Sequence, residues 1–210
     1  MKTNLLPLAK EGISYFFCSV SVLVVSLIFS FDFLAFLSLV SSIFIGYSFR
    51  NPERNLCVFE AASFLSPVDG IVESIEELHN HRYSYKIEIQ SSYKDVGILR
   101  APANATVTAV SKHNGTRVSS NSKLFTTLNE NTEISFITED ENKFSLTHRL
   151  KQSFAPLFLE LHDTQKLIQS TRYGLILNGR TSIYLPHNFR ISTSIGSELK
   201  ASESLMGYFS

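Results

Sequence analysis

Hydrophobic and polar positions divide the chain into two parts with different patterns. Residues 13–30 form an uncharged run of 18, and residues 33–49 form a second run of 17, with only Phe31 and Asp32 between them. Each run is near the lower limit of about 17–25 residues that a helix needs to cross a hydrocarbon core about 30 Å thick. Asp32 is costly at mid-membrane but cheap in the headgroup layer. The pattern therefore predicts a two-helix membrane hairpin over residues 1–50, with Asp32 at its tip.

Cations on both sides of this predicted hairpin set its orientation. Lys2 and Lys10 precede it, and Arg50 and Arg54 follow it. Because cytoplasmic flanks carry an excess of Lys and Arg, both ends are expected in the cytoplasm, and the rest of the chain on the cytoplasmic side of an inner or plasma membrane. The alternative is a cleaved signal peptide followed by an anchor. That alternative is disfavoured because no small-residue cleavage site precedes Asp32 and the apolar pattern resumes directly after it.

Beyond residue 65 the pattern is that of short strands. Polar and apolar positions alternate in three segments, and a fourth is rich in β-forming residues; they are residues 83–90, 132–137, 189–195 and 182–185. Asn114–Gly115 and Asn178–Gly179 are turn signals. Residues 51–62 and 153–169 are compatible with short helices. The sequence therefore predicts a mainly β domain with little helix over residues 51–210.

An internal echo adds detail to this prediction. Residues 66–75 and 101–110 share a frame of a small residue, proline, two variable positions, a small residue and then alternating apolar positions. Proline fixes φ before the strand, and the small residue permits a close turn. Residues 196–205 supply a third turn-and-strand unit. Such turns are typical of lipoyl-type barrel-sandwich domains, a likeness of fold that carries no activity.

Composition excludes several classes of protein. Hydrophobic residues make up 44% of the chain and charged residues 18%, and 19 Lys and Arg balance 19 Asp and Glu. A chain without net charge has no overall field that attracts nucleic acid, so no nucleic-acid partner is expected. The two cysteines, Cys18 and Cys57, offer neither a disulfide framework nor metal-ligand spacing.

The histidines do not form an evident site. His79 and His81 have a His-x-His spacing, but no Cys or carboxylate is arranged around them to complete a metal site, so a solvated loop is expected. His148 beside Arg149, and His162 beside an aspartate, are expected to be surface residues rather than a catalytic dyad.

Eight short strings occur in a characteristic order along the chain. They are Leu8-Ala9-Lys10-Glu11-Gly12, Phe49-Arg50-Asn51-Pro52-Glu53-Arg54, Ser66-Pro67-Val68-Asp69-Gly70, Arg100-Ala101-Pro102, His113-Asn114-Gly115, Asn129-Glu130-Asn131, Arg172-Tyr173-Gly174-Leu175-Ile176 and Tyr184-Leu185-Pro186. In this order, which spans nearly the whole chain, the strings resemble the phosphatidylserine decarboxylase family in its compact, membrane-anchored form.

The resemblance implies a particular chemistry. Members of that family cleave their own chain at a serine that follows glycine and convert the serine into a pyruvoyl group. The pyruvoyl forms a Schiff base with the substrate amine and serves as an electron sink while CO₂ leaves, which turns phosphatidylserine into phosphatidylethanolamine. Self-cleavage requires a hydroxyl beside its own preceding carbonyl and a base to activate it, and a proton donor then quenches the carbanion.

Asp69 and Gly97 stand at two positions that the resemblance marks as catalytic. Asp69 matches the aspartate of the family's Ser-Pro-(Ala/Val)-Asp-Gly string, which helps to orient the proton-transfer groups; Asp-Gly is also favourable in a turn for backbone reasons alone. Compact members carry Asn-Val-His-Val-Asn ahead of Arg-Ala-Pro, and its histidine is a candidate proton donor. Gly97 stands where that histidine is expected, and glycine cannot move a proton.

The resemblance places the cleavage serine near Gly179 and Arg180. The family reads Gly-x-Ile-x-Phe-Gly-Ser-Arg before Tyr-Leu-Pro, whereas here Gly179 is followed directly by Arg180 and the segment is one residue shorter. Alignment on the downstream Tyr-Leu-Pro places Gly179 itself at the serine position. Thr181 and Ser182 lack a preceding glycine, and a one-residue slip in a strand reverses the face of each side chain. The chain's single Gly-Ser pair, Gly196–Ser197, matches a later turn of the family.

These departures leave two functions open. In the first, the chain keeps the scaffold and anchor of a family of phosphatidylethanolamine biosynthesis but forms no pyruvoyl, and it binds membrane phospholipid such as phosphatidylserine, a second copy of itself or an active paralogue. In the second, it is an active phosphatidylserine decarboxylase. An envelope adaptor with a barrel-sandwich domain is a third class, but such proteins carry a long coiled coil and no sustained heptads occur here.

Overall fold

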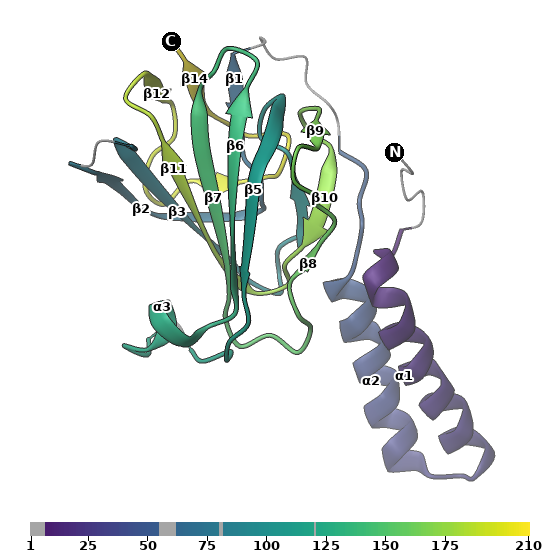
Figure 1. Cartoon of the computed structure of the whole chain (residues 1–210). Helices are drawn as coiled ribbons and strands as arrows, with labels where there is room; N and C mark the ends of the chain where they lie inside the picture. The colour runs from purple at the N-terminus through teal and green to yellow at the C-terminus, as the bar shows by residue number, and fades with distance from the viewer. Residues whose placement is uncertain (1–6, 55–61, 80–81, 120) are drawn as a thin grey trace. The chain divides into compact units, whose positions relative to one another are not determined.

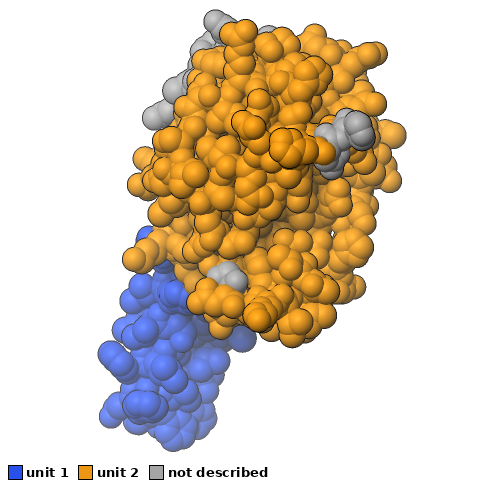
Figure 2. Space-filling model, turned by 90° about the vertical axis from the view of Figure 1, so that its left-hand side faces the viewer, with its two compact units in different colours: residues 1–53 blue, residues 54–210 orange. Residues whose placement is uncertain are grey.

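The computed structural model describes residues 7–54, 62–79, 82–119 and 121–210. The chain divides into two compact units, residues 1–53 and residues 54–210, which Figure 2 shows in different colours. The first unit is helical and the second is built almost entirely of antiparallel strands (Figure 1).

The first unit is a pair of helices that pack against each other. Helix α1 spans Lys10–Ile28 and helix α2 spans Asp32–Ser48. Small side chains line their contact: the hydroxyls of Ser19 and Ser42 hydrogen-bond to each other across it. Small residues at such an interface let two apolar helices approach closely. Most large apolar side chains of both helices are exposed, so the pair presents an apolar surface outward.

The helix pair confirms the predicted hairpin architecture, with its turn immediately before Asp32. Helix α1 is long and apolar enough to cross a membrane, whereas α2, which is also apolar, is shorter with 17 residues. The composition of α1 therefore suggests that the N-terminal unit anchors the chain in a membrane.

The second unit contains one large and two small antiparallel sheets. The eight-stranded sheet has the order β13-β2-β3-β11-β7-β6-β5-β9, and the three-stranded sheets have the orders β1-β14-β12 and β4-β10-β8. The strands of the large sheet are β2 (Gly70–Glu77), β3 (Tyr85–Ser91), β5 (Ala105–His113), β6 (Asn131–Thr138), β7 (Lys143–Leu150), β9 (Lys166–Leu167), β11 (Gly179–Leu185) and β13 (Glu198–Leu199). The small sheets contain β1 (Ser63–Leu65), β4 (Ile98–Arg100), β8 (Phe158–Leu159), β10 (Arg172–Leu175), β12 (Phe189–Ile191) and β14 (Leu205–Phe209). A short helix, α3 (Phe125–Leu128), lies in the connection between β5 and β6 (Figure 1).

The core lies on one face of the large sheet. Alternate residues of its central strands are fully buried there, including Ile87, Ile134, Leu146 and Ile183. Phe64 of the small β1-β14-β12 sheet belongs to the same cluster and makes an edge-to-face contact with Phe144 of β7. Each such side chain contributes about 1.5–3 kcal/mol by leaving water. The opposite face of the large sheet carries the polar and charged residues.

The echoed turns found in the sequence contact one another. The Leu65 N–H donates to Pro102 O at 2.9 Å, and the Arg100 N–H donates to Pro67 O at 2.9 Å. The third unit joins them, because the Ser66 N–H donates to Ser204 O at 2.9 Å. The shared frame therefore reflects three turns that satisfy one another's backbone groups at the centre of the domain.

The predicted strands are present, with two differences of detail. Residues 153–169 contain no helix but two short strands, β8 and β9, joined by turns, because each strand adds to the edge of a sheet that the local pattern does not reveal. The alternation over residues 189–195 is a strand only over Phe189–Ile191. Most of residues 51–62, also compatible with a helix, lies outside the described residues.

Candidate active site

Three of the sequence strings that carry the family resemblance, residues 66–70, 113–115 and 129–131, meet at one end of the large sheet. Antiparallel pairing brings the start of β2, the end of β3, the start of β11 and the end of β7 to the same edge, where Gly179 pairs with both Ser91 and Leu150. The end of β5 at His113 and the start of β6 at Asn131 also pair there, and α3 lies beside them (Figure 1). Positions far apart in the sequence are thus close in space.

Asp69 is buried immediately before β2, at what we call the aspartate corner: Asp69, Arg54, Ser91 and Ala201. Its Oδ1 accepts a hydrogen bond from the Ala201 N–H at 2.8 Å, and its Oδ2 accepts one from the Arg54 guanidinium. The Ser91 hydroxyl donates to the Asp69 carbonyl at 2.6 Å. This aspartate therefore joins three separate segments of the chain, which fits a turn residue as well as a catalytic one.

The ionisation of Asp69 reflects opposing influences. Burial raises the pKa of Asp69 above its ordinary value, although the backbone N–H groups of Ala201 and Val96 and the Arg54 guanidinium all favour the charged form. Arg54 also contacts Glu203 at 3.4 Å, and its flanking position beside the hairpin gives no sign of these two carboxylate partners. Its place at the end of the Phe49–Arg54 string is the signal that pointed to it.

Gly97, Ile176 and Gly179 meet at a second place, which we call the glycine corner. The Ile176 N–H donates to Gly97 O at 2.7 Å. A Cβ on Gly97 would lie 2.7 Å from Ile176 O, and a Cβ on Gly179 would lie 2.6 Å from Arg149 O and 2.4 Å from Ile176 Cδ1. Real Cβ atoms do not approach other atoms so closely, so backbone fills the space that side chains at both positions would need.

Arg180 points away from the glycine corner, onto the polar face of the large sheet. Its guanidinium pairs with Glu73 at 2.8 Å and with Glu88 at 3.5 Å. Glu88 is shared with Lys86 at 3.0 Å, and these two cations lower the pKa of Glu88 although its burial acts in the opposite direction. The arginine after Gly179 is thus held in an ion-pair network on the sheet.

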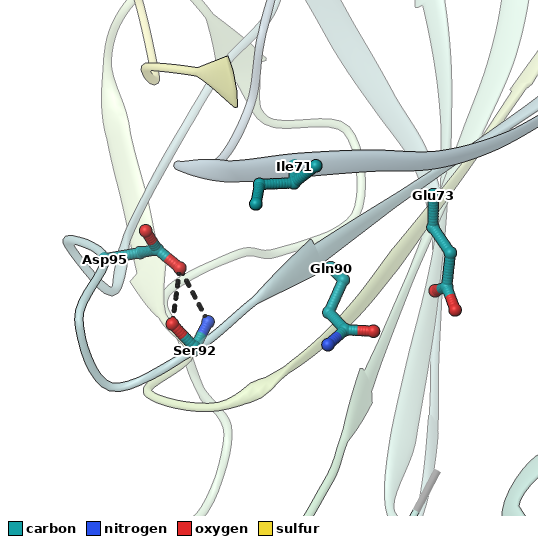
Figure 3. Close-up of a pocket in the computed structure, with 5 residues that line it drawn as sticks. All are labelled: Ile71, Glu73, Gln90, Ser92 and Asp95. Atoms are coloured by element: carbon teal, nitrogen blue, oxygen red, sulfur yellow. Dashed lines mark hydrogen bonds between the residues drawn. The ribbon is translucent and has the colours of Figure 1, made fainter. Parts of the chain in front are cut away.

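An open hollow of about 250 Å³ adjoins this end of the sheet. It is lined from β2, from β3 and from the loop after β3 by Ile71, Glu73, Gln90, Ser92 and Asp95 (Figure 3). Asp95 Oδ2 accepts hydrogen bonds from the N–H and the hydroxyl of Ser92, both at 2.8 Å. With two carboxylates on its wall, the hollow suits a small group that carries positive charge, such as an ammonium.

His148 is not a surface residue, and that expectation was wrong. It is fully buried on the core face of β7, where Nδ1 lies 2.9 Å from Thr181 Oγ1 and Nε2 lies 2.8 Å from the Tyr173 hydroxyl. Burial lowers the pKa of His148 to about 3, so the ring is neutral. The alternation of β7 could have identified it, since Phe144, Leu146 and His148 share one face. A hydroxyl beside an imidazole is the arrangement of an activated nucleophile, but Thr181 is fully buried in a paired strand.

His162 is exposed, as expected. His79 is exposed, as expected, and His81 lies outside the described residues. Among the described residues, no group of three or more His, Cys, Asp or Glu is arranged to hold a metal ion.

Comparison with known proteins identifies the family to which the chain belongs. The family model described as phosphatidylserine decarboxylase matches residues 42–207. A phosphatidylserine decarboxylase proenzyme of Desulfotalea psychrophila is 30% identical over 209 residues, covering 96% of each chain. Proenzymes of Syntrophus aciditrophicus and Geotalea daltonii are 26% and 27% identical, over 96% and 99% of this chain and 97% and 99% of theirs.

The chain therefore belongs to the phosphatidylserine decarboxylase family, and with it to phosphatidylethanolamine biosynthesis. The substrate of that family is phosphatidylserine, and its prosthetic group is a pyruvoyl made from the family's own chain.

Proposed function

We propose that this family member does not cleave itself and works as a single uncut chain without a pyruvoyl group. In this proposal the helical unit anchors it in an inner or plasma membrane, with the β unit on the cytoplasmic side. The β unit binds membrane phospholipid, phosphatidylserine foremost, and assembles with a second copy or with an active relative.

The observation that carries the proposal is the close packing of backbone at the glycine corner. The family's chemistry needs a hydroxyl beside its own preceding carbonyl and a proton donor close to it. Gly97 and Gly179 offer neither group, and a Cβ at either position would lie within 2.7 Å of a backbone oxygen. The residues present therefore do not fit a pyruvoyl group.

The aspartate corner supports the same proposal, because Asp69 has a structural role there. Asp69 keeps the family's residue, and each of its three oxygens accepts a hydrogen bond from Arg54, Ser91 or Ala201. Its buried contacts give this aspartate a structural reason to be present even where no proton is transferred.

An active decarboxylase that converts phosphatidylserine into phosphatidylethanolamine and CO₂ is the second candidate. What favours it is Asp69 in its family position, together with likeness to proenzymes over 96% or more of the chain. Its nucleophile would have to be a hydroxyl other than the expected serine, such as Thr181 beside His148.

Intact-mass spectrometry of the purified full chain distinguishes the two candidates. The proposal expects one species at the mass of the uncut 23.6 kDa polypeptide. A C-terminal fragment that begins near residue 180 and carries a keto-acyl cap would establish the second candidate and overturn the proposal.

A further inference from the structure

Two arginines stand side by side on the polar face of the large sheet, directly beyond the glycine corner. Arg149 of β7 and Arg180 of β11 are register partners in the antiparallel ladder. Both guanidinium groups lie over the ring of Phe125 in α3, with the guanidinium carbons 5.8 Å and 5.2 Å from the ring centre. Two like charges are thus held next to each other under one aromatic side chain.

The hydrogen bonding of this pair is incomplete. The Nε atoms of both arginines are buried, and neither has a hydrogen-bond partner in the structure. Within the part of the chain that the structure describes, the Arg149 side chain forms no hydrogen bond or ion pair, although its backbone belongs to the β7 ladder. Nearly all buried polar atoms in proteins have a partner, and a charged group without one is especially costly, so an unmatched guanidinium calls for an explanation.

The surrounding charges do not supply the missing partner. Glu73 and Glu88 both pair with Arg180, and Glu88 is also bound to Lys86. Among the described residues no carboxylate remains within ion-pair distance of Arg149. A further cation is close, because Arg180 acts together with burial to lower the pKa of Lys151.

We propose that Arg149 and Arg180, with Lys151 at the edge, form a binding site for an oxyanion of the phosphate class. Guanidinium groups match phosphate oxygens with paired, parallel N–H donors, and two adjacent guanidiniums place several donors around one anion. The ring of Phe125 adjoins both guanidiniums and would lie beside the bound anion.

The position of this site relates it to the headgroup of the family's substrate. Arg180 follows Gly179 directly, and its partner Glu73 lines the acidic hollow (Figure 3). A phosphate at the arginine pair and an ammonium at the hollow would together match an amino-phospholipid headgroup. That headgroup and free inorganic phosphate share the recognised chemistry. The lipid source rests on the proposed function, whereas the anion site itself does not.

The test is a calorimetric titration of the full chain in detergent micelles at constant ionic strength, with inorganic phosphate in one arm and glycerophosphoserine in the other. We expect saturable binding that Arg149→Gln weakens at least tenfold and Arg149→Lys weakens less, because lysine keeps the charge but loses the paired donors. Arg190→Gln, an exposed arginine on β12 in another sheet, is the matched control and should leave binding unchanged. Circular dichroism verifies that each variant is folded.

The two arms of the titration distinguish a lipid headgroup from free phosphate as the ligand of the site. Tighter binding of glycerophosphoserine supports the site with a lipid headgroup as its ligand, and equal or tighter binding of phosphate supports it with the free ion. Binding that Arg149→Gln leaves unchanged, or no saturable binding in either arm, overturns the site. Neither result depends on whether the chain is cleaved, so intact mass still decides the proposed function separately.

Discussion

The aspartate corner and the glycine corner lie at one end of the same sheet, yet they differ in how completely their polar groups are satisfied. At the aspartate corner a buried carboxylate has a partner on each oxygen. At the glycine corner the two positions of interest carry no side chain, backbone fills the space, and beyond them lie two arginines with unpaired Nε atoms. Under the proposed function, a residue that also holds the fold together is retained, whereas residues that serve only chemistry can be lost without unfolding the domain.

Lowering the pH is expected to have the largest effect on the free energy of unfolding, through the buried His148. Burial holds the pKa of His148 near 3, whereas in the unfolded chain it is about 6.5. Between pH 3 and pH 6.5, His148 is therefore neutral in the folded state and protonated in the unfolded state. The stabilisation is complete above pH 6.5 and is lost as the pH falls towards 3, at up to about 1.4 kcal/mol per pH unit.

Urea unfolding of the full chain at a series of pH values, followed by tyrosine fluorescence, measures this loss. His148→Gln keeps groups that can bond Tyr173 and Thr181 but cannot titrate, so its stability should fall less steeply between pH 6.5 and 3. Carboxylates contribute equally to both proteins and cancel in the difference. Parallel curves for the two proteins would contradict a neutral, buried His148.

The aspartate corner should respond strongly to a single change. Asp69→Asn removes the nearer carboxylate from the buried Arg54 guanidinium and leaves it only Glu203 at 3.4 Å. Breaking a buried pair costs about 3–5 kcal/mol. The double variant with Arg54→Met should lose less than Asp69→Asn alone, because it also removes the stranded cation. Chemical denaturation of the full chain measures both.

A matched change on the polar face provides the control. Glu73 also pairs with an arginine, but its side chain is 39% exposed. Glu73→Gln should therefore cost less than about 1 kcal/mol. Equal losses for Asp69→Asn and Glu73→Gln would mean that Asp69 is not held as tightly as its buried contacts imply.

Periodicity alone was enough to predict much of the fold, and its failures have physical reasons. Two uncharged runs separated by Asp32 predicted the helix pair by their length. Alternation over residues 83–90 predicted β3 (Tyr85–Ser91), because burial in that strand follows the local period. The edge strands β8 and β9, of two residues each, carry no periodic signal. Their pairing depends on a neighbouring strand rather than on their own sequence.

The candidate site was only partly visible in the sequence. Asp69, Gly97 and Gly179 could be located by resemblance. The register of β3 and β11 places Gly179 opposite Ser91, which bonds to Asp69. Gly97 is held instead by its hydrogen bond with Ile176. Nothing local marks Arg149 as the register partner of Arg180, because that relation exists only once β7 pairs with β11. His148 was misjudged because a polar residue on a core face looks like a surface residue until the strand's alternation is followed through.

A smaller expected loss than that of Asp69→Asn tests whether the glycine corner is closed by packing. Gly97→His should destabilise the chain by about 1–3 kcal/mol, because its Cβ would lie 2.7 Å from Ile176 O. A serine inserted between Gly179 and Arg180 lengthens the adjoining loop and should relieve part of that cost, so the combined variant should be more stable than the sum of the separate changes predicts. Gly46→Ala, whose Cβ would make only an ordinary contact of 3.6 Å with Phe16, is the control for adding a side chain and should cost nothing. Chemical denaturation measures the free energy of unfolding of each variant. If the losses of the insertion and of Gly97→His simply add in the combined variant, the short loop and Gly97 do not interact.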